Sequence, residues 1–283
     1  MFKRRKTMKV LVTGANGMLG TDLCELLTKS GYELIQVTLN DFDITRKSAC
    51  EHFLDSCDFD ILIHCAAYTN VDGAESDKET AFDVNAKATS YIAQITAKKN
   101  VPIVYISTDY VFDGTTSEPY KPNDKTNPIN VYGESKLEGE KAVKINPKHY
   151  IVRTSWLYGI HGKNFVETMI NLANTHPVLK VVNDQTGCPS WTCDVAEGII
   201  RLIKSNSPYG LYHICGGGYT TWYDFTREIF KLAAIEKEII PVRTEEFPRP
   251  AKRPTFSPMN NNGFLRDWKE ALKNYMSLRK KVL

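Results

Sequence analysis

The sequence contains no apolar run near the ~18 residues that a helix needs to span a bilayer, so no membrane-spanning segment is expected. Its basic start, MFKRRKTM, is followed by no apolar stretch of signal-peptide length, because Met8 leads directly into the strand-like KVLVTG. We therefore expect no secretion signal and a cytoplasmic protein. No internal repeat is visible either, so a repeat architecture is not expected.

The seven cysteines form no C-x-x-C pair, and their number is odd, so a disulfide framework is not expected. Several lie in apolar surroundings, such as Cys65 in ILIHCAA, which favours buried thiols in a reducing cytoplasm. Cys188 and Cys193, in CPSWTC, could chelate a metal only with partners that the sequence does not reveal. We expect no dedicated metal site.

The chain also lacks a strong net charge, since its formal charge at pH 7 is +3. Four positive charges come from Lys3, Arg4, Arg5 and Lys6, so the rest of the chain carries 3 − 4 = −1. A near-neutral body gives no reason to expect nucleic acid as a partner. We expect residues 1–7 to form a disordered basic extension; a tag for a membrane surface or for nucleic acid is the alternative.

What the sequence does contain is the composition of a soluble globular protein, with 283 residues, 42% of them hydrophobic and 24% charged. In the first half, short β-rich runs alternate with helical patterns, from KVLVT at 9–13 to HYIVRTSW at 149–156. Alternation with near-continuous apolar strands predicts an α/β fold with a doubly wound parallel sheet, here of five strands.

The second half keeps some alternation of strands and helices but has longer loops. One of these loops, EFPRPAKRPTFSPMNNNG, is rich in proline and asparagine. We expect it to be an ordered loop or linker that crosses a surface.

Glycines in TGANGMLG follow the first predicted strand and open the first predicted helix. Glycine there allows a tight turn and lets the backbone approach a pyrophosphate, whose charge the helix N-terminus stabilises. The spacing G-x-x-G-x-x-G is one residue longer than the common dinucleotide fingerprint, so the flanking strand and helix support the prediction. We expect cofactor contacts from Gly14, Asn16, Gly17, Met18, Leu19 and Gly20.

The position of this loop in the first half of the chain indicates which half binds the cofactor. Residues 8–157 are predicted to form a Rossmann-type dinucleotide-binding domain. Residues 158–283 are predicted to form mainly a smaller α/β substrate domain, with some segments returning to the Rossmann sheet.

The end of the second predicted strand, in YELIQVTLND, bears on the choice of cofactor. A carboxylate there would accept a hydrogen bond from a free ribose 2′-hydroxyl and repel a 2′-phosphate. The position falls on Thr38, whose hydroxyl can donate to a phosphate, while Asp41 and Asp43 are expected to lie too far around the loop to take the acid's part. The sequence thus favours NADP(H) over NAD(H), although no arginine is evident to pair with the phosphate.

Ser107 and Thr108 end the predicted strand VPIVYIST, at the edge where open α/β sheets bind ligands. Tyr132 and Lys136 follow in YGESK, and residues four apart lie on one face of a helix. A surface pair on a solvated helix is the alternative explanation for these two residues. Their order after a glycine loop and a hydroxyl-bearing strand end favours a shared site.

The chemistry of these groups suits the reduction of a carbonyl. A phenol of pKa ~10 is a weak acid at neutral pH, and a nearby lysine charge is expected to lower the pKa of Tyr132. Thr108 can hold a carbonyl oxygen as charge builds on it, a nicotinamide can supply hydride, and Tyr132 can supply the proton.

Taken together, the motifs resemble the extended short-chain dehydrogenase/reductase superfamily and, within it, the dTDP-4-dehydrorhamnose reductase family. The resemblance runs from Met8 to about Leu272. Besides the glycine loop and YGESK, its motifs are CAAYTNVDGAE, FDVNAKAT, ISTDYVFDG, RTSWLYG, NFVETM, DQTGCPSW, YHICGGGYTTWYDF and RPAKRP.

The resemblance implies reduction of the C4 keto group of dTDP-4-dehydro-6-deoxy-L-mannose to dTDP-L-rhamnose. It implies Thr108, Tyr132 and Lys136 as the catalytic residues, with Lys136 also bonding the nicotinamide ribose. Further cofactor contacts carried over from the family are Asp43, Ile44, Ala66, Ala67 and Tyr68; they join Thr38, which the end of the second predicted strand indicates.

Sugar contacts carried over in the same way fall on Val71, Tyr110 and Trp156. Arg253, in RPAKRP, is the expected diphosphate ligand, because a nucleoside diphosphate needs cationic donors. Trp156 could equally be a core aromatic residue. Asn85 is expected to be a structural bridge, and Ser135, inside YGESK, to point away and matter little.

Two other functions stay open on sequence alone. One is another nucleotide-sugar reductase or an epimerase of the same superfamily. The other is a regulatory subunit like the non-catalytic partner of methionine adenosyltransferase, which the intact Thr108, Tyr132 and Lys136 disfavour. Of protein partners, the resemblance suggests at most a homodimer.

Overall fold

The computed structural model describes residues 7–282. The predicted basic extension therefore lies outside the described residues, apart from Thr7. Within residues 7–282, no helix is both long and apolar enough to cross a membrane.

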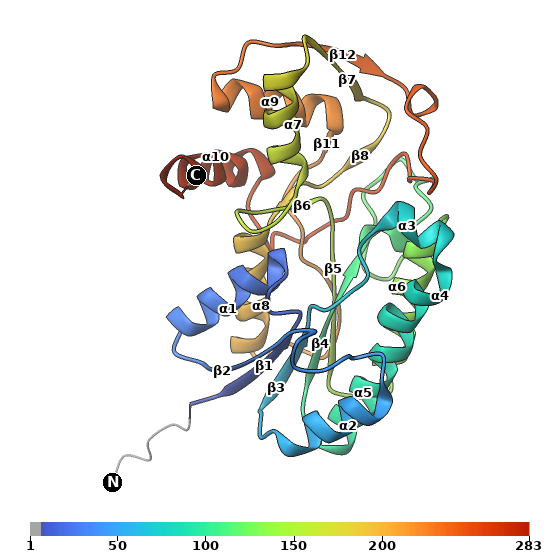
Figure 1. Ribbon diagram of the computed structural model, residues 1–283, viewed down its shortest axis with the longest axis vertical. Coiled ribbons are helices and arrows are strands. Elements are labelled where there is room, and N and C mark those ends of the chain that lie inside the picture. Colours follow the sequence, from blue (N-terminus) through green and yellow to red (C-terminus); the bar gives the residue numbers. More distant parts are fainter. Residues whose placement is uncertain (1–6, 283) are drawn as a thin grey trace.

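A parallel sheet forms the centre of the lower part of the molecule in Figure 1. Its strands pair in parallel in the order β10-β5-β4-β3-β1-β2, and the inner strands are almost wholly buried. The strands are β1 (Lys9–Thr13), β2 (Glu33–Val37), β3 (Ile61–His64), β4 (Ile103–Thr108), β5 (His149–Thr154) and β10 (Gly210–His213). The first half supplies the five predicted strands, and the sixth comes from the second half.

Helices cover both faces of this sheet, which confirms the doubly wound α/β fold (Figure 1). On one face α1 (Met18–Lys29) packs with α8 (Thr192–Lys204), a helix from the second half. On the other face lie α2 (Lys47–Ser56), α5 (Ala88–Lys98) and α6 (Val131–Val143). Apolar residues at helical spacing on each helix form the two cores beside the sheet.

A continuous helical segment over residues 78–98 contains a π-helical turn. It consists of α4 (Lys78–Phe82), a π-helical turn (Asp83–Lys87) and α5, and the short α3 (Val71–Ser76) precedes it. A π-helical turn inside a helix often marks a functional site. Here the turn carries Asn85, which is buried against α6.

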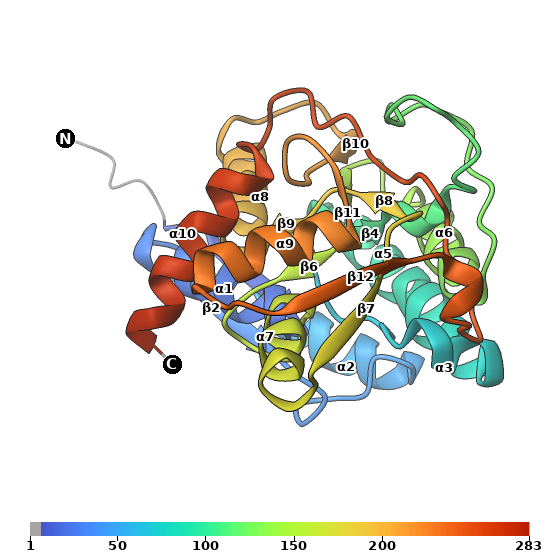
Figure 2. The ribbon, with the colours of Figure 1, turned by 90° about the horizontal axis from the view of Figure 1, so that it is seen from above.

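The second lobe has a core of its own, in the upper part of Figure 1. Its helices are α7 (Phe165–Thr175), α9 (Trp222–Ala233) and α10 (Trp268–Val282). Strands β7 (Val178–Val182) and β12 (Glu238–Val242) run side by side in parallel next to α7 and α9 (Figure 2). Short pairs complete it: β6 (Leu157–Tyr158) with β9 (Ser190–Trp191), and β8 (Thr186–Gly187) with β11 (Thr220–Thr221).

The proline-rich stretch, residues 247–263, forms an ordered strap, as the sequence indicated. It makes single β-bridges from Met259 to Tyr120 and from Phe256 to Thr186. Tyr120 belongs to the first half of the chain and Thr186 to the second. The strap therefore contacts both lobes.

Helix α6 lies unusually close to β4 because it carries Gly139. A Cβ atom there would collide with the hydroxyl of Tyr105 and the carbonyl oxygen of Asn85. We predict that Gly139→Ala lowers the Tm by roughly 3–10 °C, since overpacking a dense core costs about 1–3 kcal/mol. Thermal unfolding measures this, with Glu138→Ala on the exposed face of α6 as the neutral control. An unchanged Tm in Gly139→Ala would show that the two elements can separate freely.

Candidate active site

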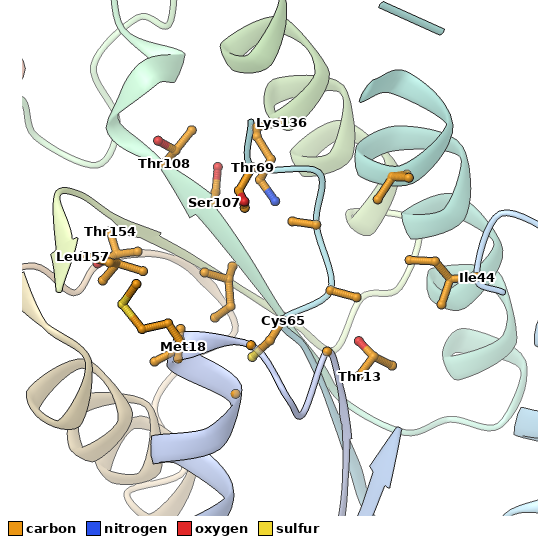
Figure 3. A pocket seen from close by; sticks show the side chains of 18 of the residues that line it. Thr13, Met18, Ile44, Cys65, Thr69, Ser107, Thr108, Lys136, Thr154 and Leu157 are labelled. Carbon is orange, nitrogen blue, oxygen red and sulfur yellow. The ribbon is translucent and has the colours of Figure 1, made fainter. Parts of the chain in front are cut away.

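A cavity of about 600 Å³ opens at the carboxyl ends of the sheet strands (Figure 3). All but two of the residues predicted for the site line it. They are Gly14, Asn16, Gly17, Met18, Leu19, Gly20, Thr38, Asp43, Ile44, Ala66, Ala67, Val71, Thr108, Tyr110, Tyr132, Lys136 and Trp156. Predicted cofactor and substrate residues thus share one cavity.

The glycine loop forms one wall of the cavity and fits a pyrophosphate. Gly14 has φ +68°, and a Cβ atom there would lie 2.6 Å from the backbone nitrogen of Ala66. Gly17 precedes α1 and supplies no side-chain cap, and the first turn of α1 contains no acidic residue. The first N–H groups of this 12-residue helix are therefore open to an anion, which the helix dipole also stabilises.

The end of β2 differs from the prediction in one respect. The backbone N–H and the hydroxyl of Thr38 both donate to one carboxylate oxygen of Asp41, at 2.7 and 2.9 Å. Asp41 is thus in direct contact with Thr38, a contact that the sequence did not reveal, although Asp41 itself is not part of the cavity lining. These hydrogen bonds, first the one from the Thr38 backbone, lower the pKa of Asp41, so a charged carboxylate lies beside Thr38. The contact between Thr38 and Asp41 was not predicted, because the sequence contains no sign of the tight turn that brings them together.

Tyr132 and Lys136 lie in the first turns of α6, where Asn130 caps the helix by accepting from Gly133 N–H at 2.8 Å. Figure 3 shows the side chain of Lys136 extending into the cavity, which Ser107 and Thr108 at the end of β4 also line. Thr108, Tyr132 and Lys136 all line the same cavity. The surface-pair alternative is wrong, because Lys136 is only 3% exposed.

Burial controls the ionisation of this pair. It lowers the pKa of Lys136 to about 7, and the Glu140 charge partly opposes that effect. Burial likewise raises the pKa of Tyr132 well above its usual value, which the Thr108 hydroxyl partly opposes. The expected lowering of the Tyr132 pKa by Lys136 is therefore wrong, because burial raises that pKa and the opposing group is Thr108. Tyr132 holds its proton, which is the state that a proton donor needs.

Asp109 is a buried member of the site that sequence reasoning missed. One carboxylate oxygen accepts from the Thr108 hydroxyl at 3.1 Å, and the other accepts from Ser257 of the strap at 2.6 Å. Burial raises the pKa of Asp109 to about 6. The contact with Ser257 spans 148 residues, so no local pattern could have shown it.

Asn85 is a structural bridge, as predicted. Its side chain exchanges two hydrogen bonds with the backbone of Tyr68, at 2.9 and 3.0 Å, and donates to Ser135 at 2.9 Å. Ser135 is fully buried, donates to the Tyr132 carbonyl and lies outside the cavity lining. The same contacts hold the backbone of Tyr68, which is one of the two predicted residues outside the cavity lining.

Arg253 is the other predicted residue outside the lining. Its guanidinium forms a two-pronged ion pair with Asp72 of α3, at 2.5 and 2.9 Å, and donates to the Ala251 carbonyl at 2.6 Å. Asp72 follows Val71, which does line the cavity. Arg253 is thus bound to the residue that follows Val71 of the cavity lining, and most of its N–H donors are engaged by Asp72 and Ala251.

Trp156 lines the cavity in a backbone conformation that is unusual for a bulky residue, with φ +46°. Its ring stacks on Trp222 of α9, with ring centroids 3.3 Å apart and planes at 4°. Trp222 is anchored in turn, because its indole N–H donates to Gln185 at 3.2 Å. Trp156 is therefore held by Trp222 of the second lobe while it lines the cavity.

Two further observations concern ligands of other kinds. Across residues 7–282, no three His, Cys, Asp or Glu side chains are grouped so as to hold a metal ion. All seven cysteines are free thiols.

The cavity, its glycine loop and its Thr, Tyr and Lys groups are matched by a known family. The family model described as RmlD substrate binding domain matches residues 8–282. The chain belongs to the RmlD substrate-binding domain family. This result confirms the resemblance that the motifs predicted.

Several named relatives can be aligned with nearly the whole of this chain. A curated dTDP-4-dehydrorhamnose reductase of Aggregatibacter actinomycetemcomitans is 38% identical, over 94% of this chain and 97% of its own length. The crystal structure of a dTDP-4-dehydrorhamnose reductase from Clostridium acetobutylicum is 45% identical, with a TM-score of 0.94, covering 96% of this chain and 100% of that chain. A dTDP-4-dehydrorhamnose reductase from Bacillus anthracis, solved in complex with NADP, is 39% identical, with a TM-score of 0.93 and the same coverage.

The Trp156 and Trp222 stack generates a prediction about substrate binding. We expect Trp222→Ala to raise KM for a sugar-nucleotide substrate about tenfold with little change in kcat, because it removes one aromatic contact that holds Trp156. Trp222→Phe should restore most of the loss. Steady-state kinetics test this, and near-UV circular dichroism should report the loss of the stack. Equal falls in kcat and kcat/KM would contradict a role in ground-state binding.

Proposed function

We propose that this protein reduces the C4 keto group of dTDP-4-dehydro-6-deoxy-L-mannose (dTDP-4-dehydrorhamnose) and yields dTDP-L-rhamnose. The observation that carries the proposal is the single cavity shared by the glycine loop and by Thr108, Tyr132 and Lys136. Relatives that span nearly the whole chain and are named dTDP-4-dehydrorhamnose reductase support the choice of substrate.

Tyr132 is proposed as the proton donor to the C4 oxygen. Its buried phenol is protonated, and Lys136 supplies a positive charge that stabilises the phenolate left after the transfer. The Thr108 hydroxyl, which now donates to Asp109, can turn to the carbonyl oxygen as charge develops there.

The cofactor proposed is NADP(H), as bound by the Bacillus anthracis relative. The residues that would hold its pyrophosphate are Gly14, Asn16, Gly17, Met18, Leu19 and Gly20, and Ala66, Ala67, Asp43 and Ile44 line the same cavity. When bound, the reduced nicotinamide supplies hydride to C4. Lys136 is proposed to bond its ribose, and Tyr68 to contribute at most through its backbone.

Substrate contacts are proposed from Val71, Tyr110 and Trp156, all of which line the cavity. The Tyr110 and Tyr132 rings meet edge to face with centroids 5.7 Å apart, so a sugar over Tyr110 would lie beside the proton donor. Arg253 remains the proposed diphosphate ligand. Arg253 already donates to Asp72. To bind a diphosphate as well, it would have to divide its N–H donors between Asp72 and the diphosphate.

The other functions have less support. An epimerase or another nucleotide-sugar reductase could use the same three residues, but the relatives named above are reductases of one substrate. A regulatory subunit has no need for a buried, titrating Lys136 beside a protonated Tyr132. A cytoplasmic location agrees with seven free thiols, and the proposed homodimer is open to measurement by light scattering.

The proton-donor role predicts a specific loss in Tyr132→Phe. NADPH oxidation driven by dTDP-4-dehydrorhamnose should fall roughly 10²–10⁴-fold, because only the proton donor is removed. Binding of NADPH, followed by fluorescence, should be unchanged. If the wild type oxidised no NADPH with this substrate, the reductase proposal would be wrong. If the variant kept the full rate, the role of Tyr132 alone would be wrong.

The contact between Thr38 and Asp41 predicts how the cofactor preference is set. The NADP(H) preference expected from Thr38 assumed a free hydroxyl, whereas Asp41 accepts from that hydroxyl and adds a negative charge. We expect Asp41→Asn to raise the ratio of kcat/KM for NADPH to that for NADH roughly five- to tenfold, since one unit charge is removed near the 2′-phosphate. Glu51→Gln, an exposed change on α2, should leave the ratio unchanged. An unaltered ratio in Asp41→Asn would place the 2′-phosphate elsewhere.

A further inference from the structure

Glu140, Arg153 and Ser107 form a buried charged cluster next to the proposed catalytic residues. The reaction proposed above assigns no role to Glu140 or Arg153. Glu140, on α6, is 1% exposed, and Arg153, on β5, is 3% exposed. The guanidinium of Arg153 donates to both carboxylate oxygens of Glu140, at 2.8 and 2.7 Å. Ser107, on β4, donates to the same carboxylate at 2.6 Å. Burial of two charges is costly unless every group is paired, and here each one is.

This cluster is connected to all three catalytic residues. Glu140 lies one helical turn after Lys136, on the same face of α6. Ser107 directly precedes Thr108 on β4. The clamp on Glu140 therefore ties the strand that carries Thr108 to the helix that carries Tyr132 and Lys136.

We propose that Glu140 is a positioning residue for the reductase: its buried carboxylate keeps Lys136 positively charged, while Arg153 prevents that carboxylate from capturing the lysine. The proposal rests on the function proposed above. It adds an electrostatic role for two residues that are outside the cavity lining.

The role of Arg153 follows from charge balance. A buried lysine next to an unpaired carboxylate would form an ion pair with it and turn away from the substrate. Arg153 donates to both carboxylate oxygens of Glu140, so the Glu140 charge acts on Lys136 through electrostatic attraction without a hydrogen bond between them. The ammonium is instead 4.2 Å from the ring centroid of Tyr105, and it lines the cavity (Figure 3). The cluster of Lys136, Glu140 and Arg153 keeps a net charge of +1.

Other titratable groups near Lys136 cannot replace Glu140. Burial lowers the pKa of His64 on β3 to about 3 and raises that of Cys65, just after it, to about 12. It raises the pKa of Tyr105 on β4 and of Tyr132 on α6 well above the usual value. All four groups are therefore neutral between pH 6 and 9. Lys136, whose pKa is lowered to about 7, depends on a fixed negative charge to stay protonated.

The test measures the protonation of Lys136 directly. In protein labelled with ¹³C at lysine Cε, the Lys136 signal is assigned by its loss in Lys136→Met, and its pKa is followed by NMR titration without ligands. Glu140→Gln should lower that pKa by about one unit, a tenfold change in proton affinity. Arg153→Met should raise it, because the freed carboxylate can then pair with the lysine.

These opposite shifts distinguish an electrostatic role from a structural one. Glu140→Gln leaves the buried Arg153 without an anionic partner, and this can prevent folding. Glu140→Gln/Arg153→Met therefore serves as the second variant, and its Lys136 pKa should also fall below that of the wild type. Glu138→Gln, an exposed carboxylate on the same helix, is the matched control and should cause no shift. A Lys136 pKa that equals the wild-type value in the double variant would overturn the proposal.

Activity provides the second measurement. Catalysis requires charged Lys136, so kcat falls as pH rises through its pKa, and this fall should occur at lower pH in the double variant. Arg153→Met should lose kcat although its lysine stays charged. If wild-type protein shows no reductase activity while the NMR shifts occur as expected, the proposed function fails and the role of Glu140 in charging Lys136 stands.

Discussion

The close packing of helix α6 on strand β4 is the constraint on which the active site depends. Gly139 lets the helix approach until Tyr105 reaches across to the carbonyls of Asn85 and Lys136, at 3.2 and 3.3 Å. At this separation, one turn of α6 directs Lys136 toward the end of β4. A longer side chain at position 139 would move Tyr132, the proposed proton donor, away from Thr108, which is proposed to bind the carbonyl oxygen. The π-helical turn belongs to the same arrangement, because it presents Asn85 to Ser135 on α6.

The site combines strong burial with a small number of fixed charges. Desolvation alone would neutralise Lys136 and keep Tyr132 protonated at any physiological pH. The proposed reaction needs the second effect but not the first, since the lysine charge would stabilise the phenolate left when Tyr132 gives up its proton. A buried carboxylate that is itself held by an arginine resolves this conflict. It supplies a negative potential, and it does not compete with the substrate for the ammonium.

Local patterns in the sequence predicted those parts of the molecule that depend on neighbours in the chain. The glycine loop, the strand ends and the four-residue spacing of Tyr132 and Lys136 each follow from one turn or one strand, and the structure shows the predicted elements. Contacts between distant segments were not predictable in this way. The pairs between Arg253 and Asp72 and between Ser257 and Asp109 join residues more than a hundred positions apart. Even the short-range contact of Asp41 with Thr38 was missed, because it depends on a turn whose geometry the composition does not specify.

The strap explains why these distant contacts lie at the active site. It begins in the second lobe, after β12, and crosses to the first lobe, where Arg253 bonds Asp72 beside the cavity and Ser257 bonds Asp109 beside Thr108. Each contact involves a carboxylate from the first lobe and a donor from the strap. Because charge-assisted hydrogen bonds of this kind weaken steeply with distance, a shift of the strap would change both the surroundings of Thr108 and the position of the proposed diphosphate ligand. The strap therefore couples the place where the nucleotide would be held to the place where the carbonyl would be reduced.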